Sequence, residues 1–184
     1  KNKHSYLSLN WGSVAGQELR FEILSQISNL NKKNILDVGC GLGDFYNFLI
    51  KNDKIINYTG VDITSDLIEA ASEKYGKNLF SCDDFLLDTT YKKNSFDYVF
   101  ASGIFATYTD NPIDIYRKFV TRMFDLCKKG IAFNSLSSWA KIKDGDEYYA
   151  DPIEIITLCK TFTDKIIFRH DYLPRDFTIF LYKD

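Results

Sequence analysis

Short runs of β-branched and aromatic residues alternate with helical patterns along the chain, and this alternation limits the folds open to it more than any other feature. The runs cover residues 34–39, 57–63, 78–85, 96–102, 130–137, 165–172 and 177–183. Helical patterns lie before and between them, at 13–29, 44–51, 65–75, 112–127 and 152–160. Strands that alternate with helices form a mostly parallel sheet with helices on both faces. The order therefore predicts an α/β fold with three layers.

The last two runs depart from this alternation. Only LPRD separates their strand patterns, which leaves no room for a crossover helix, so they should pair as an antiparallel hairpin. The 184 residues contain no internal repeat and no linker rich in Pro or Ser, and this length suits one core. We therefore predict a single domain over 1–184, a doubly wound seven-stranded mostly parallel sheet with a C-terminal antiparallel hairpin.

Composition argues against several classes of partner. Lys and Arg (23) nearly balance Asp and Glu (25) and are scattered, so the chain lacks the basic stripe that binds nucleic acid. The four cysteines are far apart, which indicates reduced thiols and no metal site. No apolar run approaches the roughly 20 residues that span a bilayer. We expect a soluble cytoplasmic protein without a nucleic-acid or membrane partner, either monomer or dimer.

A glycine-rich turn follows the first predicted strand, in the sequence NILDVGCGLGDF. Glycines between a strand and a helix let a ligand approach the backbone closely. Gly39, Gly41 and Gly43 occupy every second position, whereas the dinucleotide fingerprint has two residues between its second and third glycine. Asp37 would also repel a pyrophosphate, but it suits an ammonium group or hydroxyls. A dehydrogenase is therefore the weaker reading, and a turn that serves only packing remains an alternative.

Acidic residues stand where the next two predicted strands end. Asp62 could accept two hydrogen bonds from a ribose diol. Asp83 offers a carboxylate to an exocyclic amine, and Phe85 offers a ring to a base. Asp84 is either a solvated turn residue or a second contact for the amine. Because parallel strands end at the same edge of a sheet, these side chains predict a nucleoside-binding crevice.

Four motifs in order, ILDVGCGLGDF, YTGVDIT, SCDDFLL and FDYVFASGIFA, resemble the cofactor motifs of class I S-adenosylmethionine-dependent methyltransferases. The resemblance covers about residues 30–140 through motifs and the rest through topology. It implies S-adenosylmethionine as the cofactor and S-adenosylhomocysteine as the product. The residues that it implies around the cofactor are Asp37, Gly39, Cys40, Gly41, Asp62, Ile63, Asp83, Asp84, Phe85, Ala101, Ser102 and Gly103.

The resemblance also assigns parts of the cofactor to successive strand ends. Asp37 and the glycines would hold the methionyl part, and Asp62 would hold the ribose. Asp83 and Phe85 would hold the adenine, with Ile63 on its other face. The residues at 101–103 would lie beneath the sulfonium. Cys40 is interpreted as a small turn residue without redox chemistry.

Residues 1–29 are predicted to form an N-terminal lid segment and the first helix. In the family, tails before this helix often close over the cofactor, which gives Tyr6, Trp11 and His4 a place in a lid. Gln17 and Arg20 would bring polar groups near the methionyl carboxylate. We therefore expect Trp11 and Arg20 to contact the cofactor, and an ordinary surface face of the helix is the alternative.

Methyl transfer from a sulfonium chiefly needs alignment and exclusion of water. A hydroxyl acceptor also benefits from a base within hydrogen-bond reach. The candidate catalytic residues are His170 in the sixth run, Asn134 at the end of the fifth, and Tyr6 in the tail. For His170, a structural role in hairpin packing is the alternative.

The acceptor is least constrained. Family members that act on nucleic-acid or protein amides often carry Asn-Pro-Pro-Tyr after the fourth strand, whereas this chain has ASGI, which favours a small-molecule acceptor. The closing HDYLPRDFTIFLYK resembles bacterial enzymes that modify small metabolites or surface glycans such as capsules. We expect an acceptor oxygen of a sugar or phosphoryl-linked group, near Arg169 or Arg175. N-methylation of a small metabolite and a non-catalytic cofactor-binding sensor or partner subunit are the alternatives.

Overall fold

A computed structural model describes residues 14–107 and 109–184. The strands are β1 (Asn34–Val38), β2 (Asn57–Asp62), β3 (Phe80–Cys82), β4 (Phe96–Ala101), β5 (Cys127–Leu136), β6 (Ile166–Leu173) and β7 (Asp176–Tyr182). The helices are α1 (Val14–Ser25), α2 (Asp44–Lys51), α3 (Ser65–Tyr75), α4 (Pro112–Leu126) and α5 (Pro152–Cys159), with a short 3₁₀ helix η2 (Lys77–Leu79) before β3.

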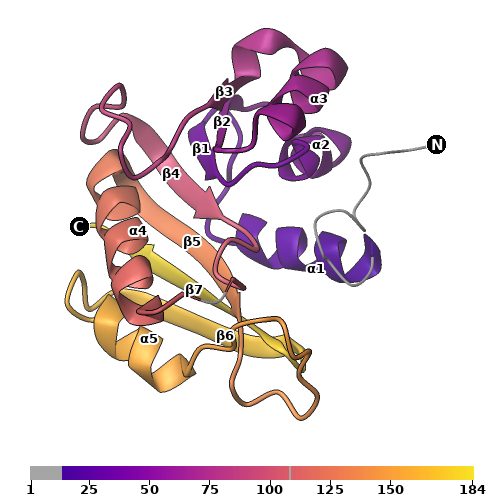
Figure 1. The fold of residues 1–184 in the computed structure, drawn as a ribbon. Coiled ribbons are helices and arrows are strands. Elements are labelled where there is room, and N and C mark those ends of the chain that lie inside the picture. Colours follow the sequence, from indigo (N-terminus) through magenta and orange to yellow (C-terminus); the bar gives the residue numbers. More distant parts are fainter. Residues whose placement is uncertain (1–13, 108) are drawn as a thin grey trace.

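The strands form one seven-stranded sheet in the order β3-β2-β1-β4-β5-β7-β6 (Figure 1). Strands β1 to β5 are parallel, and β7 is antiparallel to both β5 and β6. The chain first builds outward from β1 to β3 and then returns to place β4 on the other side of β1. Ligands bind α/β sheets at such a switch point, outside the carboxyl ends of the strands. The predicted fold class, including the C-terminal hairpin, is confirmed.

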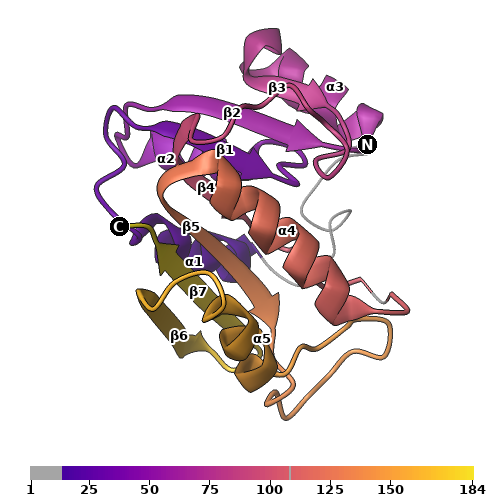
Figure 2. The same cartoon turned by 90° about the vertical axis from the view of Figure 1, so that its left-hand side faces the viewer.

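Helices cover both faces of the sheet. Helices α1, α2 and α3 lie on one face, and α4 and α5 lie on the other (Figures 1 and 2). Each face has its own apolar core: Leu36 of β1 belongs to the cluster that contains Val120 of α4, whereas Ile35 belongs to the cluster on the opposite side with Leu24 of α1 and Leu49 of α2. This division follows from the two-residue period of a strand, which sends neighbouring side chains to opposite faces.

The boundary between α4 and β5 differs from the predicted one. Strand β5 begins at Cys127, directly after α4, rather than at residue 130. Cys127 is fully buried and pairs with Phe96 of β4. The exposed Lys128 and Lys129 interrupt the apolar run, so the start of the strand could not be recognised from hydrophobicity.

Two other elements are shorter than predicted. Helix α1 ends at Ser25. Strand β3 has only three residues, because η2 takes the positions before it and the chain leaves the sheet after Cys82. Within the described residues, no helix is long and apolar enough to cross a bilayer. The same part of the chain contains no group of three metal-ligating side chains, and its four cysteines are free thiols.

Candidate active site

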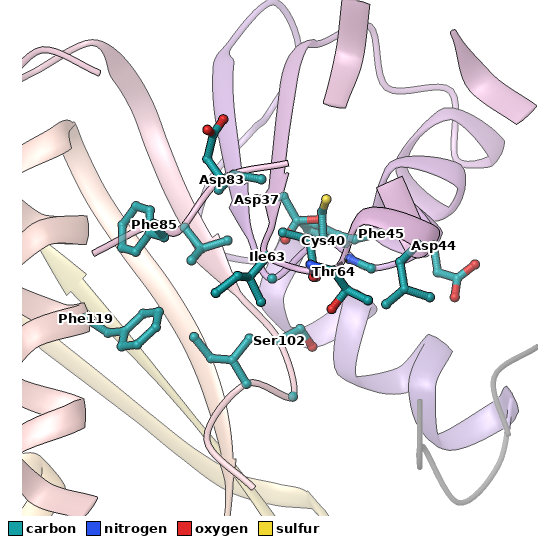
Figure 3. A pocket seen from close by; sticks show the side chains of 18 of the residues that line it. Asp37, Cys40, Asp44, Phe45, Ile63, Thr64, Asp83, Phe85, Ser102 and Phe119 are labelled. Carbon is teal, nitrogen blue, oxygen red and sulfur yellow. Dashed lines mark hydrogen bonds between the residues drawn. The ribbon is translucent and has the colours of Figure 1, made fainter. Parts of the chain in front are cut away.

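A cleft of about 450 Å³ lies at the carboxyl ends of β1 to β4 (Figure 3), and we refer to it as the glycine-turn cleft. This volume is within the range of small-molecule sites. The cleft is lined by these predicted cofactor residues: Asp37, Gly39, Cys40, Gly41, Asp62, Ile63, Asp83, Asp84, Phe85, Ser102 and Gly103. Ala101 is fully buried and does not line it. Residues from four separate sequence motifs are thus brought together around one cleft.

The backbone of the turn requires glycine. Gly39 and Gly41 have φ angles of 70° and 52°, in the region that residues with a Cβ rarely adopt. A Cβ on Gly39 would also lie 2.2 Å from Cγ2 of Ile104. The amides of Gly39 and Cys40 both donate to the Val61 carbonyl, at 2.8 and 3.1 Å. The turn is thus pressed between β2 and the loop after β4, which leaves its outer side open to a ligand.

Asp62 joins the turn to the end of β2. Its Oδ2 accepts a 2.9 Å hydrogen bond from the Gly41 amide, and its Oδ1 accepts one of 2.9 Å from the Thr64 amide. Each carboxylate oxygen can accept a further bond. The carboxylate is therefore fixed in orientation and still able to bind two neighbouring hydroxyls.

Asp37 is a buried carboxyl, with 2% of its surface exposed. Burial raises its pKa to about 7, the negative charges of Asp62 and Asp44 also raise it, and a hydrogen bond from Tyr58 lowers it. The Tyr58 hydroxyl donates to Oδ2 at 2.6 Å. Burial also raises the pKa of the Cys40 thiol well above its usual range, so that thiol stays protonated. An ammonium group is the ligand chemistry that would best compensate Asp37.

Apolar and aromatic side chains form the end of the cleft opposite the glycine turn. Ile63 is 69% exposed and faces it. Phe85 stacks on Phe119 of α4, with ring centroids 5.6 Å apart (Figure 3). The exposed Asp83 carboxylate points away from these rings in Figure 3, and Asp84 Oδ1 accepts a 2.9 Å bond from the Leu86 amide. This end can hold a flat base.

Sequence reasoning missed several lining residues, and Phe119 is the clearest case. It lies in the middle of α4, where the helical period marks it only as a core position. Asp44 and Thr64, which follow the turn and β2 directly, also line the cleft. Their positions beside two recognised motifs were the signal in the sequence that could have identified them as lining residues.

A second pocket of about 220 Å³ adjoins the glycine-turn cleft and shares Gly103 and Thr107 with it. The residues that line this second pocket are Arg20, Gly103, Phe105, Ala106, Thr107, Asn134, Ser135, Leu136, Asp146, Glu147, Arg175 and Asp176. It lies over β5 and β7 and is lined partly by the segment 137–150, whose Tyr148 amide donates to the Ala106 carbonyl at 2.8 Å. Because two residues belong to both cavities, a ligand in each could meet there.

Two ion-pair groups form part of the second pocket. Arg20 makes a buried two-pronged pair with Asp176, with Nε–Oδ1 and Nη2–Oδ2 distances of 2.9 Å. Arg175 donates to Asp144 Oδ2 at 2.8 Å and to Glu147. The structure thus places Arg20 in the second pocket rather than in the glycine-turn cleft, because the carboxylate of β7 holds its guanidinium there.

The predicted catalytic residues are not brought together. Asn134 is buried; its Oδ1 accepts from the Gly103 amide at 2.9 Å, and its Nδ2 donates to Ser102 Oγ at 2.8 Å. His170 packs against the ring of Trp139, with centroids 5.4 Å apart, and lines neither cavity. The half-buried Arg169 is paired with Asp171 at 2.6 Å. Tyr6, Trp11 and His4 lie outside the described residues.

Comparisons with known proteins agree with this geometry. Residues 29–174 match a family described as a methyltransferase domain. Rv1506c of Mycobacterium tuberculosis, which carries the name of a methyltransferase, is 29% identical over 158 residues, covering 82% of this chain and 93% of the relative. Phosphoethanolamine N-methyltransferase 1 of Zea mays is 30% identical over 118 residues, 62% of this chain and only 23% of the maize protein.

Solved structures share the fold. A methyltransferase from Archaeoglobus fulgidus superposes with a TM-score of 0.75 at 14% identity, over 97% of this chain and 98% of that one. Magnesium protoporphyrin IX methyltransferase from Synechocystis, solved with bound S-adenosylmethionine, has a TM-score of 0.69 at 14% identity, over 100% and 87% of the two chains. The buried carboxyl of Asp37 and the oriented carboxylate of Asp62 fit this cofactor's ammonium and ribose groups. This chain belongs to the methyltransferase domain family and is an S-adenosylmethionine-dependent methyltransferase.

Proposed function

We propose that the protein transfers a methyl group from S-adenosylmethionine to an oxygen of a small polar molecule bound in the second pocket. The observation that carries this proposal is that the glycine-turn cleft and the second pocket share Gly103 and Thr107. The cofactor, when bound, supplies an electrophilic methyl group. The residues of this chain then have to align the acceptor with that group and exclude water.

The cofactor placement that we propose follows the strand ends. Asp37 and the glycine turn hold the methionyl part, and Asp62 accepts hydrogen bonds from the ribose. Ile63 and Phe85 enclose the adenine, with Asp83 or Asp84 available to its amine. Phe85 and Ile63 line the cleft on the side away from the α2 terminus (Figure 3). This orientation leaves the reacting end near Ser102 and Gly103, which also contact Asn134.

The lining of the second pocket supports a polyhydroxylated acceptor. Asn134, Ser135 and Thr107 offer neutral polar groups, and Asp146 is an exposed carboxylate among the lining residues. Such groups form the hydrogen bonds that sugar hydroxyls require. Asp146 is our candidate for the base that accepts the hydroxyl proton. Arg175 could meet a phosphoryl-linked group, which would fit an acceptor used in surface-glycan tailoring.

Transfer to the nitrogen of a small metabolite is the second candidate. The maize relative and a Plasmodium falciparum relative, 31% identical over 96 residues, are both named phosphoethanolamine N-methyltransferases. Asp146, Glu147 and Asp176 line the second pocket beside the guanidinium groups of Arg20 and Arg175. A pocket lined by three carboxylates and two cationic groups would also suit a positively charged amine.

A direct test is to incubate the protein with S-adenosylmethionine carrying a labelled methyl group and a set of sugars, sugar phosphates and small amines. We expect a labelled product with a hydroxylated acceptor and an equal amount of S-adenosylhomocysteine. An Asp146→Asn variant should lower the rate while leaving cofactor affinity unchanged. A product formed only from amines would favour the second candidate. Cofactor binding without transfer to any member of the set would contradict the proposed acceptor class.

A further inference from the structure

A tyrosine beneath the glycine turn is the hydrogen-bond partner of the buried Asp37. In the pairing of β1 with β2, Tyr58 stands opposite Ile35 and Gly60 stands opposite Asp37. A Cβ on Gly60 would lie 2.8 Å from both Cys40 Sγ and Phe80 Cδ1. Side chains on the same face of neighbouring strands approach diagonally as well as directly. Since Gly60 has no side chain, the Tyr58 hydroxyl can reach Asp37 along this diagonal, at 2.6 Å.

The Tyr58 ring is held firmly in place. It is 5% exposed and packs against both Tyr46 and Phe80, with centroid distances of 4.9 and 5.7 Å. Burial and the charge of Asp37 raise the pKa of Tyr58 well above its usual range. The phenol therefore remains protonated and acts as a hydrogen-bond donor to the carboxylate.

The surroundings of Asp37 disfavour its negative charge. Asp62 at the end of β2 and Asp44 in the first turn of α2 both raise its pKa, while burial has the largest effect. In the pairing of β1 with β4, the residue opposite Asp37 is the apolar Phe100. Cys40, in the turn above, is a protonated thiol. The Tyr58 hydroxyl is thus the group that lowers the cost of ionising Asp37.

We propose that Tyr58 is a positioning residue for cofactor binding: its hydroxyl orients the Asp37 carboxylate, favours its ionised form, and so sets the pH range in which a ligand with an ammonium group binds at the glycine turn. This inference rests on the proposed placement of the methionyl group beside Asp37. It assigns a role to a side chain that is not among the residues lining the cleft.

The expected pH dependence follows from the raised pKa of Asp37, which is about 7. Below that pH the carboxyl is mostly protonated and offers no charge to an ammonium group, so affinity should rise as the pH approaches 7 and then level off. Binding below pH 7 should release a proton, because the bound ammonium favours the carboxylate. Removing the Tyr58 hydroxyl raises the pKa of Asp37 further, which moves this rise in affinity to higher pH.

The test is calorimetric titration of the wild type, Tyr58→Phe and Tyr46→Phe with two ligands between about pH 5.5 and 8.5. S-adenosylhomocysteine carries the amino-acid ammonium group, whereas 5′-methylthioadenosine lacks it. We expect Tyr58→Phe to weaken S-adenosylhomocysteine about tenfold at pH 7. Binding of methylthioadenosine should stay within about twofold. Tyr46→Phe, which removes a hydroxyl from the neighbouring ring, should match the wild type with both ligands.

Several results would overturn the proposal. Equal weakening of both ligands would make Tyr58 a packing residue, and an unchanged affinity and pH midpoint would leave it without a role. If Tyr58→Phe does not fold, Asp37→Asn is the second variant, and it should bind S-adenosylhomocysteine weakly and independently of pH. If Asp37→Asn and Asp62→Ala both keep full affinity, the cofactor placement itself is wrong. If both lose affinity while Tyr58→Phe does not, only the present inference fails.

Discussion

The glycine-turn cleft and the second pocket are built in different ways. Most of the cleft comes from turns that directly follow β1 to β4, where backbone geometry and a carboxylate at a strand end fix the shape. Ion pairs between distant segments shape the second pocket: Arg20 and Asp176 are 156 positions apart, and Arg175 and Glu147 are 28 apart. The comparison indicates that the shape of the glycine-turn cleft is encoded locally in this chain, whereas the shape of the second pocket depends on tertiary contacts.

The largest effect that we expect comes from a substitution in the second pocket. Replacing Arg20 by Ala should destabilise the protein by about 3 to 5 kcal/mol, because Asp176 would remain buried without its partner. Both side chains are more than 90% buried, which limits solvent screening. Chemical denaturation monitored by circular dichroism would measure the change in unfolding free energy.

A matched double variant separates the charge from the packing. Arg20→Met combined with Asp176→Leu should recover most of the lost stability, since no unpaired charge stays buried. The double variant should nevertheless lose acceptor binding, because it removes two lining residues of the second pocket. A stable double variant with normal acceptor turnover would break the proposed distinction between the two cavities.

The second-largest effect that we expect comes from a substitution in the glycine-turn cleft. Asp62→Ala should weaken cofactor binding by about 1.5 to 3 kcal/mol, which corresponds to roughly 10- to 150-fold, through loss of charge-assisted hydrogen bonds. Calorimetry with S-adenosylhomocysteine would give the dissociation constant. Asp66→Ala, at the exposed start of α3, is the control and should bind normally. An unchanged affinity for the Asp62 variant would remove this residue from the site.

The difference between the two cavities also explains which parts of the fold and of the site could be predicted from the sequence. Periodicity located every strand and α-helix that the structure describes, though not the 3₁₀ helix η2, because apolar side chains in each regular element have to reach a core. Asp37 and Asp62 were found because each stands at a strand end beside a motif. The place of Arg20 in the second pocket could not be predicted, because a helical pattern shows which face a residue occupies but not that a carboxylate of β7 lies opposite. Phe119 was missed for the same reason.

A smaller effect concerns the boundary between the two cavities. Asn134 connects β5 to the backbone of Gly103 and the hydroxyl of Ser102. Asn134→Ala removes both hydrogen bonds, so we expect kcat to fall about tenfold through misalignment while cofactor affinity changes about twofold at most. Steady-state kinetics and calorimetry together would check this. A large loss of cofactor affinity with unchanged kcat would place Asn134 in the cleft instead.

The smallest expected effect concerns His170, the histidine that the sequence suggested as a base. Its ring packs against both Trp139 and Phe168, and it lines neither cavity. A group that cannot reach the acceptor within hydrogen-bond distance cannot take its proton. His170→Ala should therefore change the methylation rate by less than about twofold across the pH range, with at most a modest loss of stability from lost ring packing. A pH profile of kcat that loses its acidic limb in this variant would restore the catalytic role, and it would mean that β6 extends the second pocket beyond the residues that line it in this structure.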